Sequence, residues 1–207
     1  LGGLHIPSRD ENLAMIGESI AYLRGEGKRV MYDAEHFFDG WGDDRDYSLE
    51  CLKAAGDAGA EVLVLCDTNG ANLPSQIRPA VEAVREALPE AELGIHCHND
   101  LECGVANALA AVSAGARQVQ GTVNGYGERC GNSNLISILP ALQLKLGYEV
   151  VPPEKLKQLS GVSHFVADLL NVAVDPDQAY VGRNAFAHKG GMHVAGIAAD
   201  ARTFEHM

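Results

Sequence analysis

The sequence predicts an α/β fold: the C-terminal half of a (β/α)8 barrel, with four βα units, followed by a small, mostly helical subdomain. Four short apolar segments each precede an amphipathic segment, and their starts recur roughly every 25–32 residues, the spacing of a βα unit. The apolar segments lack alternation, as expected for parallel strands covered by helices. Polar, reactive side chains follow all four segments, which favours a barrel over an open sheet with a single crevice.

The expected elements alternate along the chain. A helix over residues 10–23 comes first, and the strands are expected at residues 30–34, 61–66, 93–98 and 118–123. The helices that follow them are expected at residues 48–58, 74–87, 102–114 and 133–146. Gly59 and Gly115 follow two of these helices, where a left-handed cap favours glycine.

The character of the sequence changes after Gly147. Pro152 and Pro153 interrupt the chain, and a further amphipathic helix is expected over residues 154–170. We therefore predict a partial barrel over residues 1–148 and the start of a linker subdomain over residues 149–207.

The composition excludes several classes of partner. The formal net charge is −12, which disfavours binding to a phosphate backbone, so we expect no nucleic-acid partner. Apolar runs are too short for a membrane span and no secretory signal opens the chain, so we expect no membrane association. Five cysteines without a CxxC pair fit free thiols in the cytoplasm. We expect the chain to be truncated at both ends.

The third apolar segment leads into His96 and His98. Because side chains alternate faces along a strand, both imidazoles should point one way and Cys97 the other. Two imidazoles side by side at a strand end suit a divalent metal. For an isolated His-x-His pattern, a pair of satisfied histidines in a barrel core is an equally open interpretation.

A glycine-rich loop, Gly125 to Asn132, follows the fourth strand. Its glycines allow a tight loop with close backbone approach. The amide oxygen of Asn132 is a candidate metal ligand, and the alternative is an ordinary N-cap of the next helix.

Five motifs together resemble one family. They are YDAEHFFDG at residues 32–40, CDTNG at 66–70, HCHND at 96–100, GYGERCGN at 125–132 and AFAHKGGMH at 185–193. They closely resemble the isopropylmalate, homocitrate and citramalate synthases, above all the citramalate branch. These are acetyl-CoA-dependent Claisen enzymes on a metal-containing TIM barrel. The resemblance implies an acyltransferase that joins acetyl-CoA to a 2-oxo acid, first of all pyruvate, in branched-chain amino-acid biosynthesis.

The resemblance assigns roles to nine residues. The implied ligands of a divalent metal (Mg, Mn or Zn) are His96, His98 and Asn132. The implied substrate-binding residues are Thr68, Glu128 and Arg129. The implied catalytic residues are Glu35, His188 and His193, with His193 as the candidate base and Glu35 assisting. For His188, a purely structural role is an equally open interpretation.

One part of the family pattern is absent. Family members open with an Arg-Asp strand that supplies a further ligand, and we expect the first four barrel strands and any regulatory domain to lie outside this sequence. We expect the chain alone to be inactive, and the complete protein to be a homodimer that acts on small molecules. The alternatives are an isopropylmalate or homocitrate synthase, an HMG-CoA-lyase-like or carboxyltransferase enzyme, a metal hydrolase, and a non-catalytic module.

Overall fold

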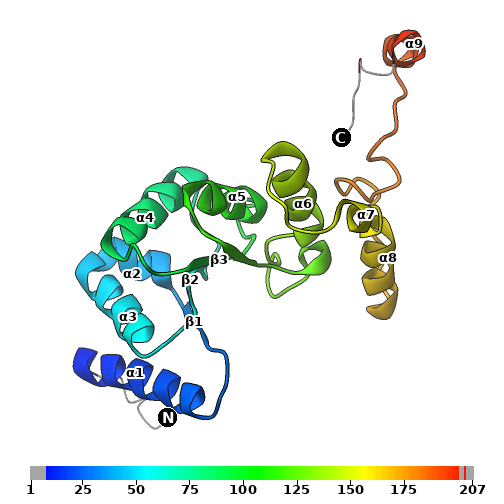
Figure 1. Cartoon of the computed structure of the whole chain (residues 1–207). Coiled ribbons are helices and arrows are strands. Elements are labelled where there is room, and N and C mark those ends of the chain that lie inside the picture. The colour runs from blue at the N-terminus through cyan, green and yellow to red at the C-terminus, as the bar shows by residue number, and fades with distance from the viewer. Residues whose placement is uncertain (1–7, 201–202, 204–207) are drawn as a thin grey trace, which may run out of the picture. The chain divides into compact units, whose positions relative to one another are not determined.

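The computed structural model describes residues 8–200 and 203, so the two ends for which cuts are predicted lie outside the described residues. Its contacts group the chain into two compact units. Figure 1 shows the helices and strands of both. The first unit is Leu1–Gly121 with Gly127–Ser133, and the second is Thr122–Tyr126 with Asn134–Met207. The predicted boundary between residues 148 and 149 follows the change in sequence character and stays a prediction.

The first unit is built on a parallel sheet in the order β1-β2-β3-β4. Its strands are β1 (Met31–Ala34), β2 (Val62–Asp67), β3 (Leu93–Cys97) and β4 (Gln118–Gln120). All four predicted strands are therefore present in the predicted order. Strand β4 ends earlier than expected, because the chain then enters the 3-10 turn η1 (Val123–Gly125), with Asn124 in the left-handed region at φ 62°.

Five helices belong to this unit, and Figure 1 shows α2 to α5 along one side of the sheet. They are α1 (Arg9–Gly25), α2 (Phe37–Asp43), α3 (Arg45–Asp57), α4 (Pro74–Ala87) and α5 (Gly104–Ala114). Ser8 and Glu11 form a capping box that starts α1, and Gly115 ends α5 at φ 117°. Helix α2 was not expected from the sequence; buried Phe37 and Phe38 hold it against the unit.

The sheet is strongly curved. Gln118 and Gln120 on β4 donate hydrogen bonds to Met31 Sδ (2.9 Å) and Asp33 Oδ1 (2.8 Å) on β1. In a flat sheet these two edge strands would be three strand spacings, about 14 Å, apart. Their side chains meet only because the sheet bends as a segment of a barrel does, which supports the predicted fold class.

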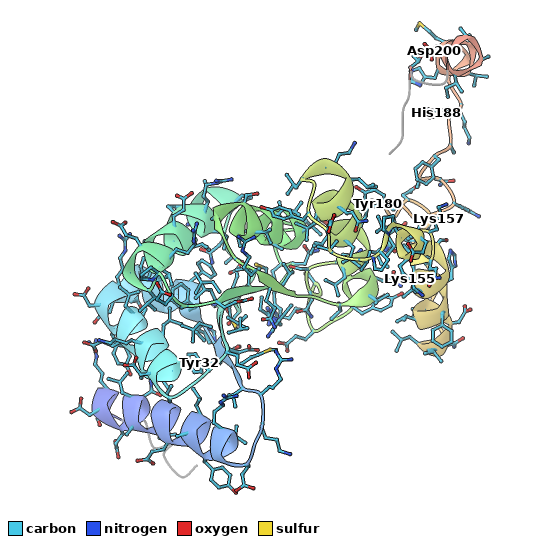
Figure 2. All side chains as sticks on the ribbon, viewed as in Figure 1. Tyr32, Lys155, Lys157, Tyr180, His188 and Asp200 are labelled. Carbon is cyan, nitrogen blue, oxygen red and sulfur yellow. The ribbon has the colours of Figure 1, made fainter. Side chains whose placement is uncertain are left out.

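The side chains of the strands point alternately to two opposite faces of the sheet. The register places Val64 beside Asp33 on β1 and beside Gly94 on β3, so these residues share the concave face. Tyr32 lies on the opposite face, near helix α3, where burial raises the pKa of its hydroxyl to about 12 (Figure 2). Strand β2 is buried along its whole length, as a central parallel strand should be.

The described residues of the second unit are mostly helical. It holds α6 (Leu135–Pro140), the π-helical turn η2 (Ala141–Lys145), α7 (Pro153–Leu156), α8 (Leu159–Leu169) and α9 (Gly191–Ala199). The predicted helix over 133–146 changes to π geometry after Pro140, which has no N–H to donate. No helix within residues 8–200 is both long and apolar enough to cross a membrane.

Candidate metal and substrate site

Two of the predicted metal ligands lie at the C-terminal end of β3, and the third lies on the loop that follows β4. His96 is the penultimate residue of β3, and His98 follows the strand and pairs with Asn132 in an isolated antiparallel bridge. The ring centroids of the two histidines are 5.2 Å apart, while Cys97 between them is 1% exposed. The predicted alternation of faces along this strand is therefore confirmed.

The His96 ring has a defined partner at one nitrogen. Its Nδ1 lies 2.9 Å from Oε1 of Gln120, the neighbouring residue on β4. An amide oxygen only accepts hydrogen bonds, so in the neutral ring this contact favours the tautomer with the proton on Nδ1 and an open Nε2. A neutral imidazole with an open Nε2 is the form that binds a metal.

The His98 ring is 7% exposed, and its Nδ1 lies between an acceptor and a donor. The Thr68 carbonyl oxygen is 2.6 Å from Nδ1, and Arg129 Nη2 is 2.5 Å from it. Arg129 Nη2 also donates to the same carbonyl at 2.7 Å, so the carbonyl accepts a second hydrogen bond only in the tautomer that carries the proton on Nδ1. Metal binding at Nε2 requires the tautomer in which Nδ1 donates to Thr68.

Asn132 is half-buried, and its side chain leaves no room for a larger residue at position 127. A Cβ atom added to Gly127 would collide with Nδ2 of Asn132. The N-cap of helix α6 is Asn134, whose side chain accepts from the N–H of Ile136 at 3.0 Å. Asn132 is thus not the N-cap of this helix, so the alternative interpretation of Asn132 as an ordinary N-cap is wrong.

These donors fit a divalent metal by their chemistry. Two imidazoles and an amide oxygen are ligands that Mn and Zn accept, and that leave further positions for a chelating substrate. The described residues contain no group of three or more His, Cys, Asp or Glu side chains that could hold a metal. The assignment of the three ligands stays a prediction.

The loop that carries Asn132 is held to the end of β3 by an ion pair. Arg129 Nε lies 2.9 Å from Asp100 Oδ1, and this hydrogen bond holds the pKa of the Asp100 carboxyl below its ordinary value. Glu128 is exposed, with Oε1 3.4 Å from Arg129 Nη1. The roles of Glu128 and Arg129 in substrate binding stay predictions. The Arg129 guanidinium already donates hydrogen bonds to acceptors within the protein.

Two further predicted residues follow the neighbouring strands. Thr68, 8% exposed, comes directly after β2, and its Oγ1 accepts a hydrogen bond from the N–H of His36 at 2.7 Å. Glu35 comes directly after β1 and is exposed. Both lie at the C-terminal end of the same sheet as His96, where parallel α/β folds place their functional residues.

The two remaining predicted residues, His188 and His193, belong to the second unit. Their ring centroids are 6.1 Å apart, and Figure 2 labels His188 on the segment that leads to α9. His193 is exposed and His188 partly so. Their catalytic role stays a prediction.

Gln120 contacts His96 and was not identified from the sequence. Asp67, the last residue of β2, is 1% exposed and accepts hydrogen bonds from Asn72 (2.7 Å) and Asn107 (3.4 Å). The sequence Gln118-Val119-Gln120 could have indicated a polar contact here, because it places two amide side chains on one face of a strand in a buried sheet.

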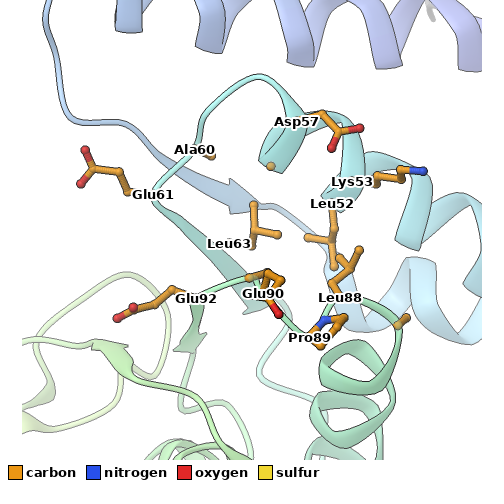
Figure 3. A pocket seen from close by; sticks show the side chains of 13 residues that line it. Leu52, Lys53, Asp57, Ala60, Glu61, Leu63, Leu88, Pro89, Glu90 and Glu92 are labelled. Atoms are coloured by element: carbon orange, nitrogen blue, oxygen red, sulfur yellow. The ribbon is translucent and has the colours of Figure 1, made fainter.

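A cavity of about 530 Å³ lies at the other end of the strands (Figure 3). Leu52, Leu63 and Leu88 line it, together with Glu61 and Glu92, which directly precede β2 and β3. It is therefore separate from the residues described above.

Comparison with known proteins supports a common origin. Residues 5–166 match the family model described as HMGL-like. The chain is 52% identical over 204 residues to an (R)-citramalate synthase of Synechocystis sp., with 95% of this chain and 37% of that protein covered. It is 41% identical over 203 residues to a homocitrate synthase of Saccharolobus solfataricus, with 98% and 43% covered.

A solved structure shows the same fold. An HMG-CoA lyase of Bacillus subtilis superposes with a TM-score of 0.69 at 19% identity, over 86% of this chain and 60% of the lyase. The chain spans less than half the length of the two synthases. With its family match over most of its residues and its half-barrel sheet, the chain belongs to the HMGL-like family.

Proposed function

We propose that the protein to which this chain belongs is an acyltransferase that condenses acetyl-CoA with pyruvate to give citramalate. One observation carries the proposal: a chain 52% identical to a citramalate synthase has His96, His98 and Asn132 together at the strand ends. In α/β barrels this is the face at which catalysis takes place. The product would serve branched-chain amino-acid biosynthesis.

Three residues would hold a divalent cation in this protein. His96 and His98 would bind it through Nε2 and Asn132 through its amide oxygen, with Mg, Mn and Zn as the candidates. When bound, such a cation orients a 2-oxo acid and polarises its keto carbonyl as a Lewis acid. Thr68, with Glu128 and Arg129, would bind the carboxylate end of the acid.

The proposal also assigns the proton transfers to named residues. We assign His193 as the base that removes a proton from the methyl group of acetyl-CoA, with His188 and Glu35 assisting. The methyl carbon then forms the new C–C bond to the keto carbon, whose oxygen takes up a proton. Water finally cleaves the thioester C–S bond and releases CoA and the free acid. A general base of this kind contributes about 10²–10⁴-fold to the rate.

The oligomeric state and location complete the proposal. Helix α8 exposes Val162, Phe165 and Leu169, which are 42%, 62% and 69% exposed, and an apolar stripe of this kind is typical of an interface. We propose a homodimer. All five cysteines are free, which supports a reducing compartment, and we propose the cytoplasm.

The test is CoA release by the product of the complete open reading frame. Acetyl-CoA is offered with pyruvate, 2-oxoisovalerate and 2-oxoglutarate, each with and without EDTA. The proposal predicts EDTA-sensitive release that is greatest with pyruvate. Release with 2-oxoglutarate instead would indicate a homocitrate synthase, and no release with any acid would refute the synthase function.

A further inference from the structure

We propose that Asp33 and Gln120 act as a positioning pair that holds His96 in the tautomer with an open Nε2. The inference rests on the proposed function in one respect, namely that His96 binds the metal. It concerns two residues to which no role in the reaction has so far been assigned. Neither would touch the metal or the substrate, so both would act through His96.

The geometry forms a short chain of hydrogen bonds across the concave face of the sheet. Asp33 Oδ1 accepts from Gln120 Nε2 at 2.8 Å, and Gln120 Oε1 lies 2.9 Å from His96 Nδ1. Asp33 is on β1, Gln120 on β4 and His96 on β3, so residues from three strands meet. Asp33 and Gln120 are 87 positions apart in the sequence and meet because the sheet curves.

The direction of each hydrogen bond follows from the chemistry of the groups. A carboxylate only accepts, so Asp33 draws the NH2 end of the Gln120 amide toward itself. The amide is planar, so its oxygen then faces His96 and accepts the proton of Nδ1. The only nitrogen left to bind a cation is Nε2. The charge of Asp33 thus selects the tautomer of an imidazole that it does not contact.

Without the carboxylate this selection is lost. If position 33 offered both a donor and an acceptor, the Gln120 amide could turn over and donate to Nδ1, which would place the ring proton on Nε2. That tautomer cannot bind a cation through Nε2. Changing such an outer partner of a metal-binding histidine lowers metal affinity by about 10–100-fold.

The same strand offers a matched control. Gln118 lies two residues earlier on β4, on the same face, and donates to Met31 Sδ on β1 at 2.9 Å without contacting an imidazole. Gln118→Glu therefore makes the same chemical change on the same strand, away from His96.

The experiment uses Asp33→Asn, Gln120→Glu, the double variant and Gln118→Glu. In the double variant, the carboxylate introduced at position 120 can only accept. It should therefore accept the His96 proton and an N–H of the amide introduced at position 33, with the charge of the pair conserved. The tautomer of His96 is read from the ¹⁵N shifts of the imidazole nitrogens in the metal-free product of the complete open reading frame, at mildly alkaline pH where imidazole is neutral. The affinity for Mn²⁺ is measured by titration of the complete open reading frame.

We expect wild type and Gln118→Glu to have the proton on Nδ1, and Asp33→Asn to show a mixture with Mn²⁺ affinity lower by about tenfold. The double variant should return to within about threefold of wild type, a rescue that a merely structural role would not produce. A proton on Nε2 in wild type, or an unchanged tautomer in Asp33→Asn, would overturn the inference. If the tautomers behave as expected but wild type binds no metal, the proposed function fails and the positioning pair stands.

Discussion

Gly127→Ala tests whether Asn132 belongs to the metal site. Position 127 has no room for a methyl group, because an added Cβ would collide with Asn132 Nδ2 and lie 3.1 Å from its Cγ. Real Cβ atoms almost never approach a heavy atom within 3.0 Å, so the end of the Asn132 side chain must move by about 1 Å or more. Bonds between a metal and its ligands tolerate about 0.2 Å, so this movement should remove the amide oxygen from the site.

The expected effect is specific to metal binding. The colliding atom is the end of a side chain that can turn away, so we expect unfolding free energy to fall by only about 1 kcal/mol. Mn²⁺ affinity should fall by about tenfold or more, which is about 1.4 kcal/mol of binding free energy. Urea unfolding measures the first quantity, and titration with Mn²⁺ measures the second.

Gly17→Ala is the matched control, because a Cβ at position 17 of helix α1 meets nothing within 4 Å. It should leave Mn²⁺ affinity unchanged and stabilise the chain by up to about 1 kcal/mol, the difference in helix propensity. If Gly127→Ala folds normally and binds Mn²⁺ within about twofold of wild type, Asn132 is not a ligand and the reasoning is refuted.

Three further predictions concern the surroundings of the site. Asn107→Ala removes a donor from the buried Asp67 carboxylate and should lower the unfolding free energy by about 1–3 kcal/mol in urea; an unchanged midpoint would argue against this network. Arg129→Gln should raise the pKa of Asp100 toward its ordinary value in an NMR titration, unless the ion pair is absent in solution. Because that pKa is lowered in the folded chain, the carboxylate stabilises the fold above its ordinary pKa, and this contribution is lost as pH falls through the lowered value. Cys66, whose thiol pKa burial raises to about 12, should resist alkylation until the chain unfolds, as mass spectrometry would show; rapid labelling in the native state would contradict this.

Much of the fold could be predicted from local patterns. The strands are short and apolar, and helix α4 begins and ends where the sequence indicated, because Pro74 suits a first helical turn. Helix α2 was missed because its seven residues are too few to show a helical period, and tertiary burial of Phe37 and Phe38 holds it. The predicted helix over 133–146 changes from α to π geometry after Pro140, and this change depends on the path of the chain beyond that residue.

The candidate site could be predicted only in part. His96 and His98 are visible in the sequence because the two-residue period of a strand places them on one face. The partners of their Nδ1 atoms could not be predicted in the same way. Gln120 reaches His96 from the next strand, and Thr68 offers its backbone carbonyl to His98, a contact that no side-chain pattern encodes. These partners depend on sheet register and curvature, which the sequence does not display.

The most direct test of the central claim is the identity of the product formed from acetyl-CoA and pyruvate by the complete open reading frame. Mass spectrometry of the reaction, with and without EDTA and beside His96→Ala, measures citramalate and free CoA together. We expect equal amounts of the two products in wild type, and loss of both after chelation or in the variant. Release of CoA without citramalate, or citramalate formation that survives both treatments, would contradict it.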